Sequence, residues 1–226
     1  MMLDIGEISN KIARKIVMET DGDEEKRSII AYGIFAMFQI AISIIFVIVF
    51  GLLFNVLIEA LIVSFSISIL RKYSGGVHAT SPMRCAIIGT VICILIPKVI
   101  LLFNLGSITI IGFGIFVFAL SYYLVFKLAP VDSENKPIKK AERRDMLKRK
   151  SIIILTVYLI IACLFIINFY LFNSYKALVY CTCLYGGILW QVISLTKLGH
   201  KIVNKVDYFL NRIYINLGGT EDEKNK

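Results

Sequence analysis

Charged residues are scarce in this chain of 226 residues: Asp, Glu, Lys and Arg make up 18% of it, whereas hydrophobic residues make up 58%. A soluble domain has about a quarter of its residues charged and about half apolar. The apolar excess is concentrated in runs of roughly 17 to 25 residues, which are long enough to cross the hydrocarbon core of a bilayer. This balance excludes an ordinary soluble domain and indicates an integral membrane protein.

The chain also lacks several motifs of well-known sites. Its five cysteines form no CxxC pair and no Cys/His spacing suited to zinc, so neither a disulfide framework nor a metal site is expected. A nucleotide-binding loop is absent, and no cofactor is expected. The first 28 residues have no continuous apolar core followed by a cleavage site, so we expect no signal peptide.

The apolar runs predict the fold. Spans are expected at about 29–50, 52–70, 85–105, 107–128, 152–172 and 176–196. The segment 1–28 precedes them, and the tail 197–226 follows them. We therefore predict an all-α membrane protein, a bundle of six transmembrane helices (29–196) flanked by amphipathic N- and C-terminal helices.

Both flanking segments place isoleucine, valine or phenylalanine at spacings of three and four, which is typical of an amphipathic helix. The residues are Ile5, Ile8, Ile12 and Ile16 in the first segment and Ile202, Val206, Phe209 and Ile213 in the tail. Such helices next to a span are expected to lie along the membrane surface. A simple interfacial anchor and a docking surface for a substrate both remain open as their role.

The distribution of basic residues predicts the orientation. The net charge is +9, and all of the 25 Lys and Arg residues except Lys98 and Lys176 fall on one side of the predicted bilayer. Because cytoplasmic loops carry the excess of Lys and Arg, both termini, the loop 71–85 and the basic loop 129–151 are expected in the cytoplasm. The basic residues do not form a patch among aromatics, so anionic lipid or an acidic partner is expected rather than nucleic acid.

The loop between the second and third spans carries the most distinctive residues. It reads RKYSGGVHATSPMRC and contains His78 and Cys85. Ser81 suits an N-cap and Pro82 the first helical position, which would place Cys85 near the positive end of a helix dipole. A histidine and a helix N-terminus both favour the thiolate, the nucleophilic form of cysteine.

The spacing of the two residues constrains the backbone. On one continuous helix, seven residues would separate His78 from Cys85 by roughly 10 Å along the axis, too far for a hydrogen bond. The loop must therefore fold back, and Gly75 and Gly76 supply the freedom to do so. A Cys–His pair within hydrogen-bond reach is typical of an activated nucleophile. From residue types alone, two ordinary surface residues remain the alternative.

Two blocks of residues resemble one family. Arg71, Gly75, Gly76, His78 and Cys85 form the first block, after the second span. The second block follows the fourth span and consists of Ala129-Pro130-Val131-Asp132, Asn135, Pro137 and a run of Lys and Arg. Their order and spacing on a six-span chain resemble the AgrB (accessory gene regulator protein B) family of Gram-positive bacteria.

The resemblance implies a membrane cysteine endopeptidase that cuts the C-terminal tail from a quorum-sensing pro-peptide similar to AgrD and promotes its thiolactone or lactone cyclisation. By position, Cys85 would be the nucleophile and His78 the base. Supporting or substrate-binding roles would fall to the remaining matched positions, which are Arg71, Gly75, Gly76, Asp132, Lys139 and Lys140.

Several alternatives stay open from the sequence. A residue that orients His78 is not evident, and Asp132, Glu134 and Asn135 are candidates because their loop shares the cytoplasmic side. A non-enzymatic transporter or peptide exporter and a protease that releases a linear peptide are the rival functions. Packed span interfaces are compatible with a homodimer.

Overall fold

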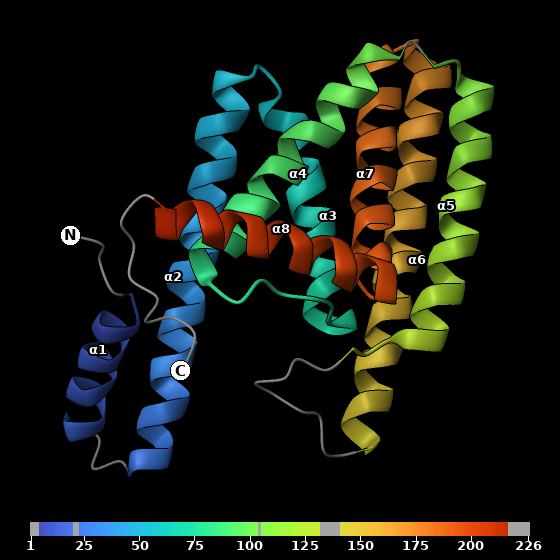
Figure 1. Ribbon diagram of the computed structural model, residues 1–226. Helices are drawn as coiled ribbons and strands as arrows, with labels where there is room; N and C mark the ends of the chain where they lie inside the picture. The colour runs from blue at the N-terminus through green and yellow to red at the C-terminus, as the bar shows by residue number, and fades with distance from the viewer. Residues whose placement is uncertain (1–4, 20–22, 104, 132–140, 217–226) are drawn as a thin grey trace.

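The computed structural model describes residues 5–19, 23–103, 105–131 and 141–216, and these ranges are folded almost entirely into helices (Figure 1). The helices are α1 (Ile5–Glu19), α2 (Glu24–Leu53), α3 (Leu57–Ser74), α4 (Pro82–Leu102), α5 (Ser107–Leu128), α6 (Ala141–Phe172), α7 (Tyr175–Ile193) and α8 (Lys197–Asn216). No β-strand occurs in the described ranges, where an isolated bridge joins Gly75 and Val131. The all-α prediction is confirmed.

Five of the helices are long and apolar enough to cross a membrane, namely α2, α4, α5, α6 and α7. This confirms a multi-pass membrane protein. The expected span 52–70 corresponds to α3, which is helical but is not among these five. The 18 residues of α3 include Glu59, Arg71 and Lys72, whereas α2 and α6 continue as long uncharged stretches beyond their charged first turns. The six-span arrangement and its orientation therefore stay predictions.

Two helices begin earlier than the apolar runs do. α2 starts at Glu24, where the Asp23 side chain accepts a hydrogen bond from the Lys26 N–H and acidic residues fill the first turn. α6 starts at Ala141, so the second half of the expected basic loop 129–151 is helical. Charged residues such as Glu, Arg and Lys are good helix formers, so a charged stretch lengthens a helix beyond its apolar part.

The helix α7 lies at the centre of the bundle and packs against α3, α4, α5 and α6. Close packing depends on glycine: a Cβ on Gly187 would collide with the Ser66 hydroxyl on α3, and one on Gly114 of α5 with the Tyr185 ring. Small residues at these positions thus allow the helices to approach closely. The resulting core surrounds α7 and reaches the end of α3.

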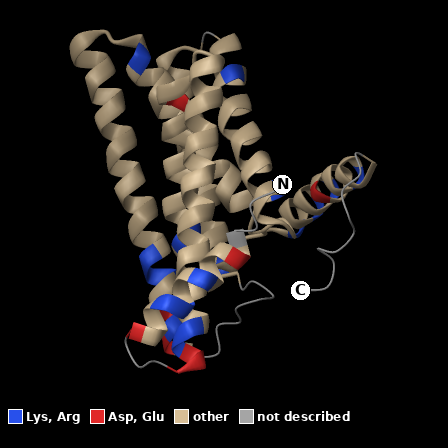
Figure 2. Cartoon of the chain, turned by 90° about the vertical axis from the view of Figure 1, so that its left-hand side faces the viewer, with Lys and Arg blue, Asp and Glu red and all other residues tan. Residues whose placement is uncertain are grey.

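The amphipathic helices lie outside this bundle. α1 packs on α2 as an antiparallel hairpin, and α8 crosses in front of α3 and α4 at a steep angle to the bundle (Figure 1). Ser9 and Ala13 are the buried residues of α1. Charged side chains, mostly Lys and Arg, gather at the lower end of the bundle, and few occur at the upper end (Figure 2).

Candidate active site

The α3–α4 loop (residues 75–81) begins with two glycines that no other residue could replace without strain. Gly75 has a φ of 70° and Gly76 a φ of 136°, both in the region that favours glycine. A Cβ on Gly75 would collide with the Val131 carbonyl oxygen, and one on Gly76 would lie 2.7 Å from the Ser194 hydroxyl oxygen. The loop therefore turns in a space with no room for a side chain.

Backbone contacts tie this turn to distant parts of the chain. The Val131 N–H donates to the Ser74 carbonyl oxygen at 2.9 Å, and the Val77 N–H donates to the Ser194 carbonyl oxygen at 3.3 Å. The first contact comes from the segment that follows α5, and the second from the end of α7. The two sequence blocks, one after α3 and one after α5, thus meet in space.

Gln191 on α7 anchors the same turn from inside the bundle. Its side chain is completely buried, and its amide nitrogen donates to the Ser74 hydroxyl at 3.0 Å and to the Gly75 carbonyl oxygen at 2.8 Å. Buried polar groups are normally hydrogen-bonded, and these two bonds satisfy the amide nitrogen of Gln191. The sequence reasoning missed this residue, although an uncharged polar residue within an otherwise apolar run is the pattern that would have revealed it.

The loop ends where α4 begins, and the start of this helix is as the sequence predicts. Ser81 is the N-cap residue with an extended backbone, and Pro82 occupies the first turn. The Ser81 side chain makes no capping bond, but its carbonyl oxygen accepts the Cys85 N–H at 2.9 Å. Cys85 therefore lies one turn into α4, half-buried, and its own N–H is already engaged.

The fold brings the His78 and Cys85 side chains together. Nδ1 of His78 lies 3.9 Å from Sγ of Cys85, at the outer limit of a hydrogen bond to sulfur. Catalytic hydrogen bonds are often this long before a substrate is bound. Because Nδ1 faces the thiol, a proton accepted from sulfur goes to Nδ1, and the neutral ring carries its hydrogen on Nε2.

The electrostatic surroundings keep this imidazole neutral. Part of the ring is exposed, yet the surrounding protein desolvates it, and this burial together with the positive charge of Arg71 lowers the pKa of His78 to about 4. His78 is consequently unprotonated at neutral pH and able to accept a proton. The Nε of Arg71 is itself buried, with no hydrogen-bond partner among the described residues.

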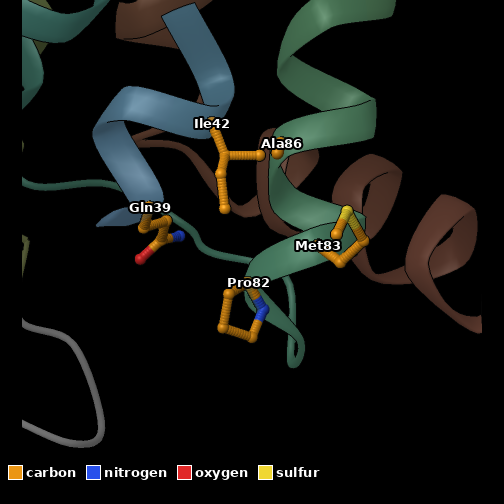
Figure 3. Close-up of a pocket in the computed structure, with 5 residues that line it drawn as sticks. All are labelled: Gln39, Ile42, Pro82, Met83 and Ala86. Carbon is orange, nitrogen blue, oxygen red and sulfur yellow. The ribbon is translucent and has the colours of Figure 1, made fainter. Parts of the chain in front are cut away.

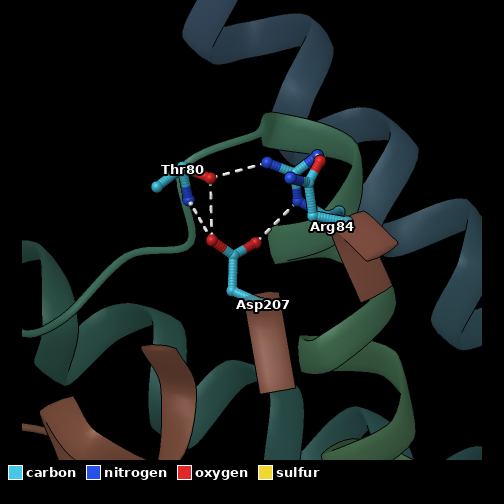
Figure 4. Close-up of polar contacts among 4 residues, drawn as sticks. Thr80, Arg84 and Asp207 are labelled. Carbon is cyan, nitrogen blue, oxygen red and sulfur yellow. Dashed lines mark hydrogen bonds and ion pairs between the residues drawn. The ribbon is translucent and has the colours of Figure 1, made fainter. Parts of the chain in front are cut away.

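A polar cluster around the buried Arg84–Asp207 ion pair lies between the loop and α8 (Figure 4). Asp207 of α8 accepts hydrogen bonds from the Thr80 N–H at 3.1 Å, from the Thr80 hydroxyl at 2.7 Å and from Nε of Arg84 at 2.7 Å. Arg84 also donates to the Thr80 hydroxyl at 2.6 Å and to the Asn211 side chain at 3.1 Å. Burial alone would raise the pKa of Asp207, but these bonds hold it below its usual value.

A small pocket opens beside the first turns of α4 (Figure 3). Gln39 and Ile42 of α2 line one side of it, and Pro82, Met83 and Ala86 of α4 line the other. The residues from α4 flank Cys85 in sequence, so the pocket adjoins the helical turn that carries the thiol. Its lining is mostly apolar, which suits an apolar side chain better than a charged one.

Comparison with known proteins identifies the family of this chain. The model of accessory gene regulator B, AgrB, matches residues 9–195. The chain belongs to the AgrB family. Membership links it to the processing of quorum-sensing peptides, as the resemblance in sequence indicates. The AgrB match ends two residues before α8, so the helix that carries Asp207 lies outside it.

AgrB relatives of similar length support the assignment. The chain is 40% identical over 214 residues to AgrB-like protein 2 of Clostridium perfringens strain 13, covering 92% of this chain and 99% of the relative. A second AgrB-like protein, from Clostridium perfringens strain SM101, is 41% identical over 212 residues with the same coverage. An AgrB-like protein of Listeria monocytogenes serotype 4a is 34% identical over 63% of each chain. No solved structure matches.

The structure brings together one part of the expected AgrB site. Arg71, Gly75, Gly76, His78 and Cys85 all surround the α3–α4 loop. Asp132, Glu134, Asn135, Lys139 and Lys140 lie outside the described residues. Val131, which precedes Asp132, is held against Ser74. Within the described ranges, no group of three or more His, Cys, Asp and Glu side chains is placed to hold a metal ion.

Proposed function

We propose that this chain is a membrane cysteine endopeptidase that removes the C-terminal tail of an AgrD-like pro-peptide and promotes cyclisation of the remaining segment. The observation that carries the proposal is the approach of a neutral His78 to Cys85, 3.9 Å from Nδ1 to Sγ, one turn into α4. The site would lie on the cytoplasmic side of the membrane of a Gram-positive bacterium.

The cleavage step follows from the acid–base chemistry of the pair. His78 Nδ1 takes the proton of the Cys85 thiol as sulfur attacks the scissile carbonyl carbon. The tetrahedral intermediate collapses when the same imidazolium returns the proton to the leaving amine, and the tail departs. The remaining peptide is then bound to Cys85 as a thioester. Arg71 supports this step because its positive charge helps to keep His78 in the neutral form that can accept the proton.

The second step determines the product. A thiol within the bound peptide attacks the thioester carbonyl and displaces Cys85, which exchanges one thioester for another and needs no ATP. A hydroxyl in the same place would give a lactone. Water would give a linear acid instead, so cyclisation requires that water is kept from the thioester until the peptide thiol has reacted.

Basic residues support the assignment of an acidic tail as the departing group. The first turns of α6 carry Arg143, Arg144, Lys148, Arg149 and Lys150, and Lys139 and Lys140 precede them in sequence. Clustered cations raise the local concentration of an anionic ligand. Anionic lipid headgroups are a second partner for the same charges.

One experiment separates this function from its rivals. The full-length chain, Cys85→Ala and His78→Ala are each co-expressed in membranes with a pro-peptide encoded next to it, and the peptide products are weighed. A shortened product lighter by one water than the linear acid supports cyclising cleavage. A linear acid supports a simple protease, and unaltered precursor with the unmodified chain, or cleavage by Cys85→Ala, would remove the cysteine-peptidase assignment.

A further inference from the structure

The two residues that Asp207 binds, Thr80 and Arg84, both lie between His78 and Cys85 in the sequence. Thr80, which Asp207 binds through two hydrogen bonds, is two residues after His78. Arg84, which Asp207 binds through an ion pair at 2.7 Å, immediately precedes Cys85. One carboxylate on α8 therefore holds the segment that carries the base and the helix turn that carries the thiol (Figure 4).

The Arg84–Asp207 ion pair is buried, although Thr80 is exposed, so each charge of the pair depends on the other. Asp207 is 6% exposed and Arg84 is 9% exposed. A buried guanidinium that loses its carboxylate keeps its desolvation cost and must move to find another partner. Both carboxylate oxygens of Asp207 are engaged, one by Thr80 and the other by Arg84. A substitution of Asp207 therefore alters the hydrogen bonds of both Thr80 and Arg84.

Among the described residues, few other hydrogen bonds hold the segment of the loop around His78. Upstream of His78, the Val77 N–H is bound to the end of α7. Downstream, the loop is bound through the N–H and hydroxyl of Thr80. His78 thus lies in a short segment that is held at Val77 by the end of α7 and at Thr80 by Asp207 of α8. Loss of the contact with α8 would let this segment move relative to α4 and lengthen the distance from Nδ1 of His78 to Sγ of Cys85.

We propose that Asp207 is a positioning residue for the nucleophile: through Thr80 and Arg84 it fixes His78 at the distance from which it accepts the Cys85 proton. The inference rests on the proposed cysteine chemistry and assigns to α8, which lies beyond the AgrB match, a part in it. Asp207 does not touch the reacting atoms. It acts on the reaction through the distance between His78 and Cys85.

A double-mutant cycle tests this on the full chain in membranes without any peptide. The measured quantity is the rate at which iodoacetamide alkylates Cys85, followed by mass spectrometry of the Cys85 peptide so that the other four cysteines do not contribute. The variants are Asp207→Asn, His78→Ala and the two combined. The matched control is Asn204→Ala, at an exposed position of the same helix.

Because small misplacements of reacting groups are costly, Asp207→Asn is expected to slow alkylation by about tenfold or more. The control stays at the unmodified rate. In the His78→Ala background, Asp207→Asn has no further effect, because the residue through which it acts is gone. An equal slowing in both backgrounds, or no slowing when His78 is present, would overturn the proposal, since a merely structural residue costs the same with or without His78.

Two further variants keep the test decisive if Asp207→Asn fails to fold. Thr80→Val leaves the Arg84–Asp207 ion pair intact and removes the hydroxyl contacts, so it is expected to slow alkylation only when His78 is present. Asp207→Glu keeps the charge and both acceptor oxygens, and is expected to recover part of the rate. If the cycle succeeds while Cys85→Ala still cleaves a pro-peptide, the positioning role stands and the proposed function is the part that fails.

Discussion

The buried amide of Gln191 donates to the carbonyl oxygen of Gly75 at 2.8 Å, so the central helix α7 holds the first residue of the α3–α4 loop directly. We expect Gln191→Met, which preserves the length of the side chain, to leave the Ser74 hydroxyl and the Gly75 carbonyl without this donor. An unsatisfied buried polar group costs about 1–3 kcal/mol. The thermal midpoint in detergent should fall, and precursor cleavage should fall with it.

Ser43→Ala is the control for this change, because the Ser43 hydroxyl bonds only within its own helix, to the Gln39 carbonyl oxygen. Its midpoint should remain close to that of the unmodified chain. An unchanged midpoint for Gln191→Met would mean that the two hydrogen bonds do not stabilise the turn.

Alanine at Gly75 should abolish most of the cleavage activity. A residue with a Cβ pays about 1–2 kcal/mol in the left-handed region, and here the added carbon would also collide with the Val131 carbonyl oxygen. The turn must open, which moves His78 away from Cys85. The measurement is the rate of precursor cleavage in membranes at matched protein levels.

Gly89→Ala provides the comparison, since a Cβ on Gly89 of α4 meets no atom within 4 Å. Alanine is the better helix former, so this variant should insert and cleave normally. Equal activity of the Gly75 and Gly89 variants would contradict the close packing at the turn.

The pH dependence of cleavage should reveal a weakly basic histidine. His78 titrates near pH 4 in the folded chain, against 6.5 for an ordinary histidine. It therefore stays neutral as pH falls through 6.5. The acid limb of the pH profile, where protonation of His78 lowers kcat/KM, should appear only as pH approaches 4. The unfolded chain takes up this proton at the higher pH, so His78 also lowers folding stability as pH falls from 6.5 to 4.

Arg71→Met should move this acid limb to higher pH, because the positive charge of Arg71 is one of the two causes that lower the pKa of His78. Lys72→Met, at the neighbouring exposed position, should leave the limb in place. A limb centred at 6.5 in the unmodified chain would show that the ring is solvated and unperturbed.

Charge reversal at Lys139 and Lys140 should slow cleavage if these residues dock an acidic tail. The expected change is a rise in KM with little change in kcat, since docking stabilises substrate and transition state alike. High salt should weaken the difference because exposed charges are screened. Lys176→Glu, on the expected outer side of the membrane, is the control, and membrane insertion is measured for each variant.

The sequence predicts local features of this site well and contacts between distant residues poorly. The helix start at Ser81-Pro82, the fold-back of the loop and five of the six expected spans follow from neighbouring residues and are present. Gln191 and Asp207 act on residues more than a hundred positions away, and no periodicity or spacing records such contacts. The apolar run at 152–172 does not predict the early start of α6 at Ala141, because charged residues end only the apolar part of a helix and not the helix itself.

The bond between Val131 and Ser74 has a consequence for how this protein can vary. It couples the end of α5 mechanically to the base of the α3–α4 loop, since Val131 lies three residues after Leu128, the last residue of α5. The length of this short connection is therefore constrained: a residue inserted between 129 and 131 would displace the turn at Gly75, and cleavage should fall with it.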